Sequence, residues 1–246
     1  MTLSILATFV AIILLLSHGA YAISIPTANL VGEWKFENNV LDTSGNNNNG
    51  INNGATFVPG KIGTALSFDG VSNVVSVPNS PTLNFGNSGS FSISLWMKST
   101  QSGGGDAGFG LIVDKRRNND GIYQGYSIED NSGLLIGRIR DASANDVPVF
   151  STTNVNDGKF HHIVYIVDRS TQTSKLYVDK TLQATASTSS VGSIDSSVNL
   201  LFGGQDPPNT QIDFYSGVLD QVRIYDKALS SSEVKHLFNE GQGKNK

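Results

Sequence analysis

The stretch Ser90-Phe91-Ser92-Ile93-Ser94-Leu95-Trp96-Met97-Lys98 decides the fold class of this 246-residue chain. Its odd positions are large and apolar, whereas serine occupies positions 90, 92 and 94. Because side chains alternate between the two faces of a strand, this pattern predicts a β-strand with one buried face and one solvated face.

Short apolar runs of the same kind recur along the chain, separated by residues that favour turns. The run at 160–167, within the candidate strand 160–168, is apolar on both faces, which predicts a central strand. Residues 46–49, 103–105 and 118–120 are expected to be loops. The other candidate strands are 30–36, 65–68, 74–77, 110–114, 126–129, 134–140, 147–151, 174–178, 182–186, 200–203 and 218–225.

The composition also favours a β protein. The chain has 26 Gly, 30 Ser and 23 Asn but only 5 Glu, and such residues favour turns over helices. Lys and Arg total 17 and Asp and Glu total 21, for a net charge of −4, which argues against a nucleic-acid-binding protein with a basic face. Cysteine is absent, which excludes a thiol enzyme, a disulfide scaffold and a zinc-thiolate site.

One helix is expected near the C-terminus. Ser230 and Glu233 have the spacing of a capping box, apolar residues follow at helical spacing, and Gly241 supplies a stop. His236 is expected to be an exposed residue of this helix.

The N-terminus has the pattern of an export signal. Residues 5–16 form an apolar run interrupted only by Thr8, and Ala20-Tyr21-Ala22 fits a signal-peptidase site. We therefore expect a signal peptide at 1–22, a linker at 23–29, one domain at 30–241 and a polar tail at 242–246. A secreted or cell-surface protein without membrane insertion follows from this division. An uncleaved anchor is the alternative, although the apolar run is shorter than the roughly 20 residues of a spanning helix.

Several blocks of sequence together resemble a known domain. They are Leu30-Val31-Gly32-Glu33-Trp34-Lys35-Phe36, Asp42-Thr43-Ser44-Gly45-Asn46, Gly54-Ala55-Thr56-Phe57-Val58-Pro59-Gly60-Lys61-Ile62-Gly63, Ala65-Leu66-Ser67-Phe68-Asp69-Gly70, the stretch at 91–98, Asp157-Gly158-Lys159-Phe160-His161-His162-Ile163-Val164 and Leu219-Asp220-Gln221-Val222-Arg223-Ile224-Tyr225. In order and spacing they resemble the LamG-like jellyroll domain of the concanavalin A-like lectin/glucanase superfamily, over residues 30–241. The resemblance implies an all-β fold, a two-sheet antiparallel jelly-roll sandwich with a short C-terminal helix.

Enzyme chemistry finds little support in the residues. Laminarinase-type glycosidases of this superfamily carry Glu-x-Asp and a second Glu on one strand. Here Glu33 and Glu37 flank Lys35, and Glu129-Asp130 precedes a stretch typical of a turn. His161 and His162 begin a strong strand and point to opposite faces, so we expect structural roles for them. The chain is therefore predicted not to be an enzyme, with a glycoside hydrolase as the second alternative.

A recognition module that binds an extracellular glycan or surface protein is the preferred prediction. Aromatic rings can stack on sugars and carboxylates can accept hydroxyl hydrogen bonds, and such residues gather in or near predicted loops. A structural component of the cell envelope or matrix without sugar binding is the first alternative. The dense basic cluster Lys115-Arg116-Arg117 is expected to be a solvated turn. The candidate ligand-binding residues are Phe109, Tyr123, Tyr126, Tyr215, Asp106, Asp114 and Asp130.

The resemblance also implies one structural calcium ion. Asp220 alternates in phase with Val222 and Ile224, so its carboxylate is expected on the core side of its strand, where it needs a partner. Asp69, at the end of another strand, is the second candidate ligand. The alternative is that both carboxylates simply accept backbone N–H bonds as turn caps.

Overall fold

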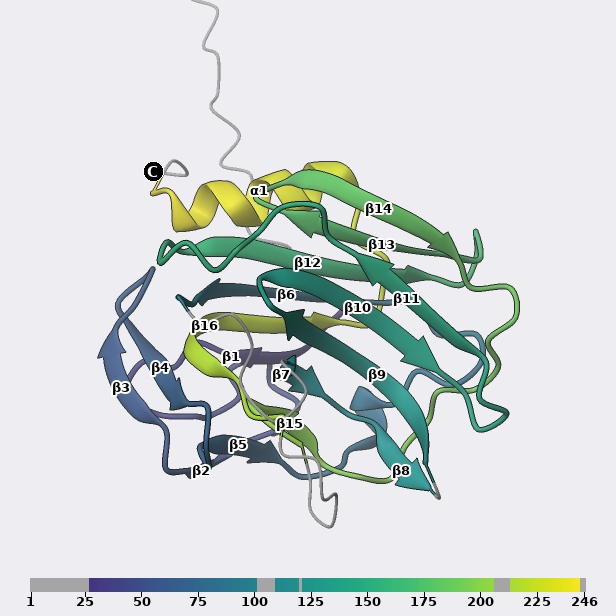
Figure 1. The fold of residues 1–246 in the computed structure, drawn as a ribbon, viewed down its shortest axis with the longest axis horizontal. Coiled ribbons are helices and arrows are strands. Elements are labelled where there is room, and N and C mark those ends of the chain that lie inside the picture. Colours follow the sequence, from purple (N-terminus) through teal and green to yellow (C-terminus); the bar gives the residue numbers. More distant parts are fainter. Residues whose placement is uncertain (1–26, 101–108, 120, 206–212, 244–246) are drawn as a thin grey trace, which may run out of the picture.

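The chain folds into two antiparallel sheets packed face to face, as the computed structural model shows for residues 27–100, 109–119, 121–205 and 213–243 (Figure 1). The predicted jelly-roll sandwich is thus confirmed. Sheet A has the strand order β14-β13-β12-β6-β16-β4-β3, with β1 also paired to β16. Sheet B has the order β11-β10-β9-β7-β15-β5-β2, with β8 paired to β9.

The strands of sheet A are β1 (Leu30–Trp34), β3 (Thr56–Pro59), β4 (Thr64–Asp69), β6 (Phe91–Lys98), β12 (His161–Asp168), β13 (Thr173–Val178), β14 (Thr181–Ser187) and β16 (Ser216–Tyr225). Those of sheet B are β2 (Ile51–Asn53), β5 (Val74–Val77), β7 (Phe109–Asp114), β8 (Arg117–Asn119), β9 (Ile122–Asn131), β10 (Leu134–Arg140), β11 (Asp146–Phe150) and β15 (Leu200–Phe202). A short 3-10 helix, η1 (Pro81–Leu83), and one α-helix, α1 (Ser231–Gly241), complete the described elements.

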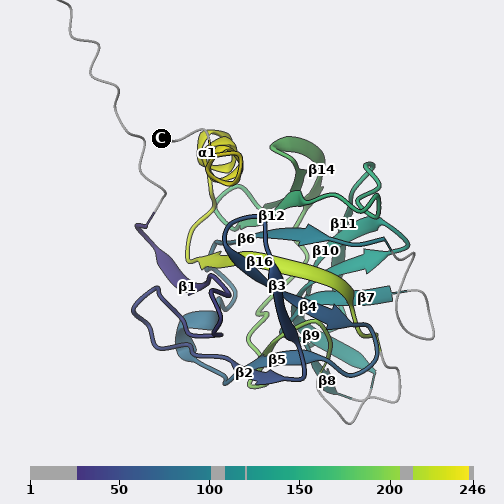
Figure 2. The ribbon, with the colours of Figure 1, turned by 90° about the vertical axis from the view of Figure 1, so that its left-hand side faces the viewer.

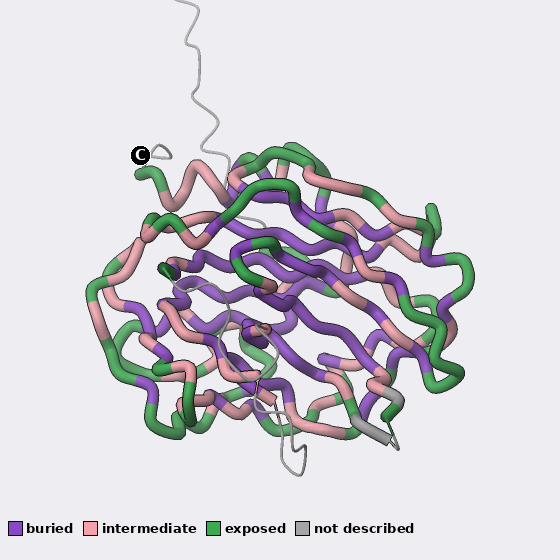
Figure 3. The backbone as a smooth tube through the Cα atoms, in the orientation of Figure 1, coloured by how far each residue is buried: buried purple, intermediate pink, exposed green. Residues whose placement is uncertain are grey.

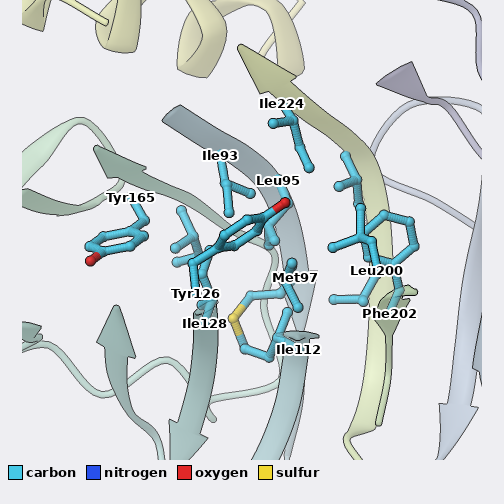
Figure 4. Packing of buried hydrophobic residues seen from close by; sticks show 14 of the residues in the cluster. Ile93, Leu95, Met97, Ile112, Tyr126, Ile128, Tyr165, Leu200, Phe202 and Ile224 are labelled. Atoms are coloured by element: carbon cyan, nitrogen blue, oxygen red, sulfur yellow. The ribbon is translucent and has the colours of Figure 1, made fainter. Parts of the chain in front are cut away.

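The predicted alternation of β6 is confirmed on its inward face. Phe91, Ile93 and Leu95 are fully buried in the core cluster. Figure 4 shows Ile93 and Leu95 next to Tyr126 of sheet B. The expectation for the other face is wrong, because Ser92 and Ser94 are also buried. Ser92 Oγ donates to the Lys227 carbonyl and accepts from the Leu229 amide, so the segment leading into α1 covers this face.

Helix α1 begins as predicted. Ser230 is the N-cap, and it forms a capping box with Glu233. The helix lies outside the sandwich and is seen nearly end-on in Figure 2. Its residues Val234 and Leu237 pack on outward residues of sheet A in a second, smaller apolar cluster. His236 is only 7% exposed, so its predicted exposure is wrong.

Strand β16 contains a bulge that changes which residues share a face. Asp220 pairs with Trp96, but Arg223 pairs with Ser94, so two residues are accommodated opposite one. Gln221 takes a left-handed conformation at this point, with φ of 50°. Asp220 therefore lies on the outward face with Trp96, and the predicted core-side position is wrong.

Strands β2, β3 and β8 were not predicted. They are short, and β2 and most of β3 are exposed, so they lack the apolar alternation that marks a half-buried strand. Strand β9 is longer than the predicted strand at 126–129 and continues through Asp130 to Asn131. The turn itself follows at Ser132 and Gly133, both with positive φ.

Burial follows the two sheets, with the central strands buried and the connections exposed (Figure 3). Within the described residues, no helix has both the length and the apolar character needed to cross a membrane. The predicted signal peptide at 1–22 lies outside the described part of the chain.

Candidate ligand-binding cleft

A cleft of about 240 Å³ opens on the outward face of sheet B. This face carries residues that alternate with the core positions of β9 and β10: Glu129 follows the buried Ile128, and Arg138 precedes the buried Ile139. The volume is below the roughly 300–1,000 Å³ of sites for drug-sized ligands, so it suits one or two small rings. The lining consists of Phe109, Leu111, Arg116, Tyr123, Glu129, Arg138, Arg140, Gln205 and Asp213.

Two arginines and three carboxylates form a continuous ion-pair network in this face, which we call the cleft network. Arg116 donates from Nε to Asp114 Oδ1 over 2.5 Å and from Nη1 to Glu129 Oε1 over 2.6 Å. Arg138 donates from Nε to the same Glu129 oxygen over 3.1 Å and also pairs with Asp146. The network fixes both guanidinium groups, so their remaining donors have defined directions.

Burial shapes the electrostatics of the network. It raises the pKa of the Asp114 carboxyl to about 6, even though the charge of Arg116 opposes the shift, and the nearby charge of Glu129 adds to it. The pKa of Arg116 is raised, because its two carboxylate partners outweigh its own burial. A buried charge network of this kind adds little net stability, since desolvation offsets the Coulomb attraction.

The basic cluster 115–117 is not the predicted solvated turn. Lys115 is 1% exposed, and its Nζ donates to Asn79 Oδ1 and to the carbonyls of Ser196 and Val198. Burial lowers the pKa of this amine to about 8. Arg116 belongs to the cleft network, so only Arg117 of the three is exposed.

Two of the four predicted aromatic residues line the cleft, namely Phe109 and Tyr123. The Arg116 guanidinium lies 5.5 Å from the centre of the Tyr123 ring, a cation–π contact that orients both groups.

The other two aromatic residues, Tyr126 and Tyr215, are buried in the core and do not line the cleft. Tyr126 is 1% exposed, packs 5.0 Å from the ring of Phe91, and donates from its hydroxyl to the Leu83 carbonyl. Tyr215 is 1% exposed and donates to the Lys98 carbonyl. Neither ring has a face open to a ligand.

The predicted carboxylates also separate. Asp114 lies in the cleft network, whereas Asp130 is 3% exposed and accepts from the Gly133 amide and the Asn156 side chain. Burial raises the pKa of Asp130, opposed by those hydrogen bonds. Asp106 lies outside the described residues.

Sequence reasoning missed Arg116 as a site residue, together with six other polar groups of the lining or the network. A signal was available for two of them, because arginines at 138 and 140 alternate with apolar positions in the predicted strand at 134–140. The other missed residues are Glu129, Asp146, Gln205 and Asp213.

The two predicted calcium ligands do not form one site. Asp69 pairs with Ser216 of β16, and Ser216 lies four residues before Asp220 on the same strand. At about 3.3 Å per residue, the two positions on β16 are roughly 13 Å apart. Asp69 Oδ1 accepts from the amides of Val71, Ser72 and Asn73, which lower its pKa to about 2 against the effect of burial. Its oxygens are therefore used as a turn cap.

Asp220 is different, because it is fully buried with one oxygen unused. Oδ2 accepts from the Ile62 amide over 2.9 Å, but Oδ1 has no hydrogen-bond partner. Burial raises its pKa to about 6, opposed by backbone donors such as Ile62. Among the described residues, no group of three or more His, Asp or Glu side chains is placed to hold a metal ion.

The geometry also bears on hydrolysis. Asp114 and Glu129 share one sheet face, but Arg116 lies between them and bonds to both. Glycoside hydrolysis needs two carboxyl groups that flank the scissile bond, one of them able to give a proton. Here both are engaged with the same guanidinium, an arrangement that suits binding better than bond cleavage.

Comparisons with known proteins agree with the fold. The concanavalin A-like lectin/glucanases superfamily matches residues 69–235. The chain is 25% identical over 212 residues to Paraclostridial mosquitocidal protein 1 of Paraclostridium bifermentans, covering 81% of this chain but only 16% of that protein.

Two solved structures illustrate the likeness in three dimensions. The binding domain of Paraclostridial mosquitocidal protein 1 gives a TM-score of 0.74 at 23% identity, over 87% of this chain and 52% of that one. The binding domain of botulinum neurotoxin DC, in complex with rat synaptotagmin II, gives 0.70 at 18% identity, over 89% and 53%. This chain spans about half of each binding domain, and identities this low show the fold alone. With the family match covering more than half of its length, the chain belongs to the concanavalin A-like lectin/glucanases superfamily.

Proposed function

We propose that this protein is a non-catalytic binding module that recognises a glycan through the cleft on sheet B. The observation that carries the proposal is the cleft network itself. Five charged side chains are held by mutual ion pairs in a face that no helix of the described chain covers. Because such a network contributes little net stability, its fixed donors and acceptors are better explained by a ligand.

The chemistry of the lining supports a sugar ligand. Tyr123 and Phe109 supply rings for stacking, while arginine and carboxylate groups supply directed hydrogen bonds to hydroxyls. The two solved structures are of binding domains, and one of them is in complex with rat synaptotagmin II. They support a recognition role here without indicating a shared ligand.

A glycan array with the protein lacking residues 1–22 tests the proposal. We expect selective binding that Tyr123→Ala and Phe109→Ala each weaken at least tenfold. Phe57→Ala is the matched control, since Phe57 is an aromatic residue on β3 of sheet A and is 38% exposed. Absence of selective binding would favour the structural alternative, and release of reducing sugar from a bound oligosaccharide would favour a glycoside hydrolase.

We also propose that the protein is exported and acts outside the cell or at its surface. The support is the apolar run at 5–16 followed by Ala20-Tyr21-Ala22. Intact-mass analysis of the natively exported protein should give an N-terminus at Ile23. A mass that retains residues 1–22, with the protein in the membrane fraction, would instead indicate an anchored protein.

A further inference from the structure

Arg140 is the one arginine of the cleft lining that has no ion pair within the described residues. Arg116 and Arg138 each bind two carboxylates, whereas no acceptor among the described residues bonds to Arg140 Nε, and no ion pair to its guanidinium is formed there. Asp146 lies opposite Arg140 in the β10–β11 register, but its carboxylate is turned to Arg138. On the other side, the position opposite Arg140 is Gly125, which has no side chain to cover the guanidinium.

The Nε atom of Arg140 is shielded from solvent and still has no hydrogen-bond acceptor. Leaving a buried donor unsatisfied costs more than a typical hydrogen bond contributes, so such atoms in native proteins call for an explanation. A guanidinium presents its donors as a planar fork that matches a carboxylate in a bidentate contact. An acceptor supplied by a ligand in the cleft would satisfy this atom.

A free acceptor lies in the same lining. Arg116, Arg138 and Ser127 all donate to Oε1 of Glu129. Oε2 of Glu129 accepts no hydrogen bond from the described residues. The cleft therefore brings together a cation without an ion pair and a carboxylate oxygen that can accept a further hydrogen bond.

We propose that the ligand is an acidic sugar, with its carboxylate bound by Arg140 and a hydroxyl donating to Glu129 Oε2. The inference rests on the proposed glycan-binding function and names the class of glycan. A uronic or sialic acid offers the carboxylate and hydroxyl donors on one ring, together with a face that can pack on Tyr123. An acidic peptide offers the carboxylate but fewer donors for Glu129, and its chain is harder to fit in about 240 Å³.

Calorimetric titration with paired probes tests this assignment. The probes are a galacturonic-acid trimer and its methyl ester, and sialyllactose and lactose, with the protein lacking residues 1–22. We expect one acid to bind at least tenfold more tightly than its uncharged counterpart. Arg140→Met keeps much of the side-chain length but removes the charge, and it should abolish that preference.

Arg117→Met is the matched control, because Arg117 is an exposed arginine on β8 that does not line the cleft. This variant should retain the preference for the acid. A sulfated galactose trimer distinguishes the anion, and tighter binding of the sulfate than of either acid would overturn the carboxylate assignment.

The failures of the two proposals are distinguishable. If no glycan on the array binds selectively, the glycan-binding function itself is wrong. If array glycans bind in a Tyr123-dependent way but acids and uncharged probes bind equally, only the acidic-sugar inference is wrong. A preference for acid that survives Arg140→Met, or an acidic peptide that binds where sugars do not, also overturns it.

Discussion

The outward faces of the two sheets carry similar polar side chains, but one face is covered and the other is open. On sheet A, Ser92, Ser94 and His162 are sealed beneath α1 and the segment before it. On sheet B, the cleft network faces a space that can admit a ligand. The difference teaches that strand alternation decides which residues share a face, whereas a covering element decides whether that face is core or binding surface.

The contrast extends to the arginines of the two faces. Arg223 of sheet A has a 4% exposed side chain and bonds to Glu33 of β1 and to both carboxylate oxygens of Glu240 in α1. It therefore ties the helix to the sheet. Arg138 of sheet B, with a 19% exposed side chain, ties together only neighbouring strands of its own face.

The largest expected loss of stability comes from breaking the buried ion pair between Arg223 and Glu33. Arg223→Met leaves the carboxylate of Glu33 buried without its nearest cation, which should lower the free energy of unfolding by about 3–5 kcal/mol. Arg138→Met, the matched change on the open face, should cost about 1–2 kcal/mol, because Glu129 keeps its ion pair with Arg116 and Asp146 is partly exposed. Urea denaturation measures both, and equal losses would mean that the two faces are equally sealed.

The adjacent histidines His161 and His162 allow a buried and a partly exposed position to be compared through the pH dependence of stability. Burial under α1, with help from the charge of Arg223, lowers the pKa of His162 to about 3. The stability linked to its neutral form is present above pH 6.5 and is lost as the pH falls toward 3. Between pH 7 and 4.5 this loss is expected to be roughly 2–3 kcal/mol.

His162→Gln should remove that acid-induced loss, as seen from urea denaturation at several pH values. His161 is the internal control, because its hydrogen bonds to Asp179 and Asp157 raise its pKa, against partial burial. Its contribution is present below the unfolded pKa and is lost as the pH rises through the folded pKa. If His161→Gln and His162→Gln changed the pH dependence of stability with the same sign, the two histidines would not lie in opposite environments.

Asp220 should give a smaller effect of the opposite sign from His162. Because burial raises its pKa to about 6, its contribution to stability is present below the unfolded pKa and is lost as the pH rises through 6. Between pH 4.5 and 7 we expect a loss of about 2 kcal/mol, and Asp220→Asn should flatten this part of the profile. An unchanged profile would mean that Asp220 Oδ1 is solvated or bonded in solution.

The same variant tests the predicted calcium ion. An ion bound only to the folded protein at 100 times its dissociation constant would add about 2.7 kcal/mol, seen as a higher melting temperature in millimolar calcium than in chelator. If Asp220 is a ligand, Asp220→Asn should reduce that shift, whereas Asp69→Asn should not. Identical melting curves for the wild-type protein would remove the ion.

The smallest stability effect is expected at the open face. Tyr123→Ala should change the free energy of unfolding by less than about 1 kcal/mol, because the ring lies at the cleft rather than in the core. Leu95→Ala, at a fully buried position of β6, should cost about 2–5 kcal/mol and serves as the comparison. Thermal unfolding of both variants would show whether the cleft is separate from the core.

The sequence was most informative where local chemistry alone decides structure. Alternation placed Leu95 inward, and the Ser230–Glu233 pair located the start of α1, because both signals depend on residues close in the chain. It was wrong for His236 and the serines of β6, since burial there depends on a helix packing onto a distant strand. The cleft required three strands to come together, so Phe109 and Tyr123 were found but Arg140 was not.

The bulge at Gln221 changes, partway along β16, which residues face outward. Before it, even-numbered residues such as Asp220 face outward, and after it, odd-numbered residues such as Arg223 do so. One inserted residue thus works as a phase shift, which lets a single strand present both groups to the side covered by α1. Without the bulge, the alternation of side chains would continue unchanged along β16. One of these charged side chains would then be directed into the apolar space between the sheets.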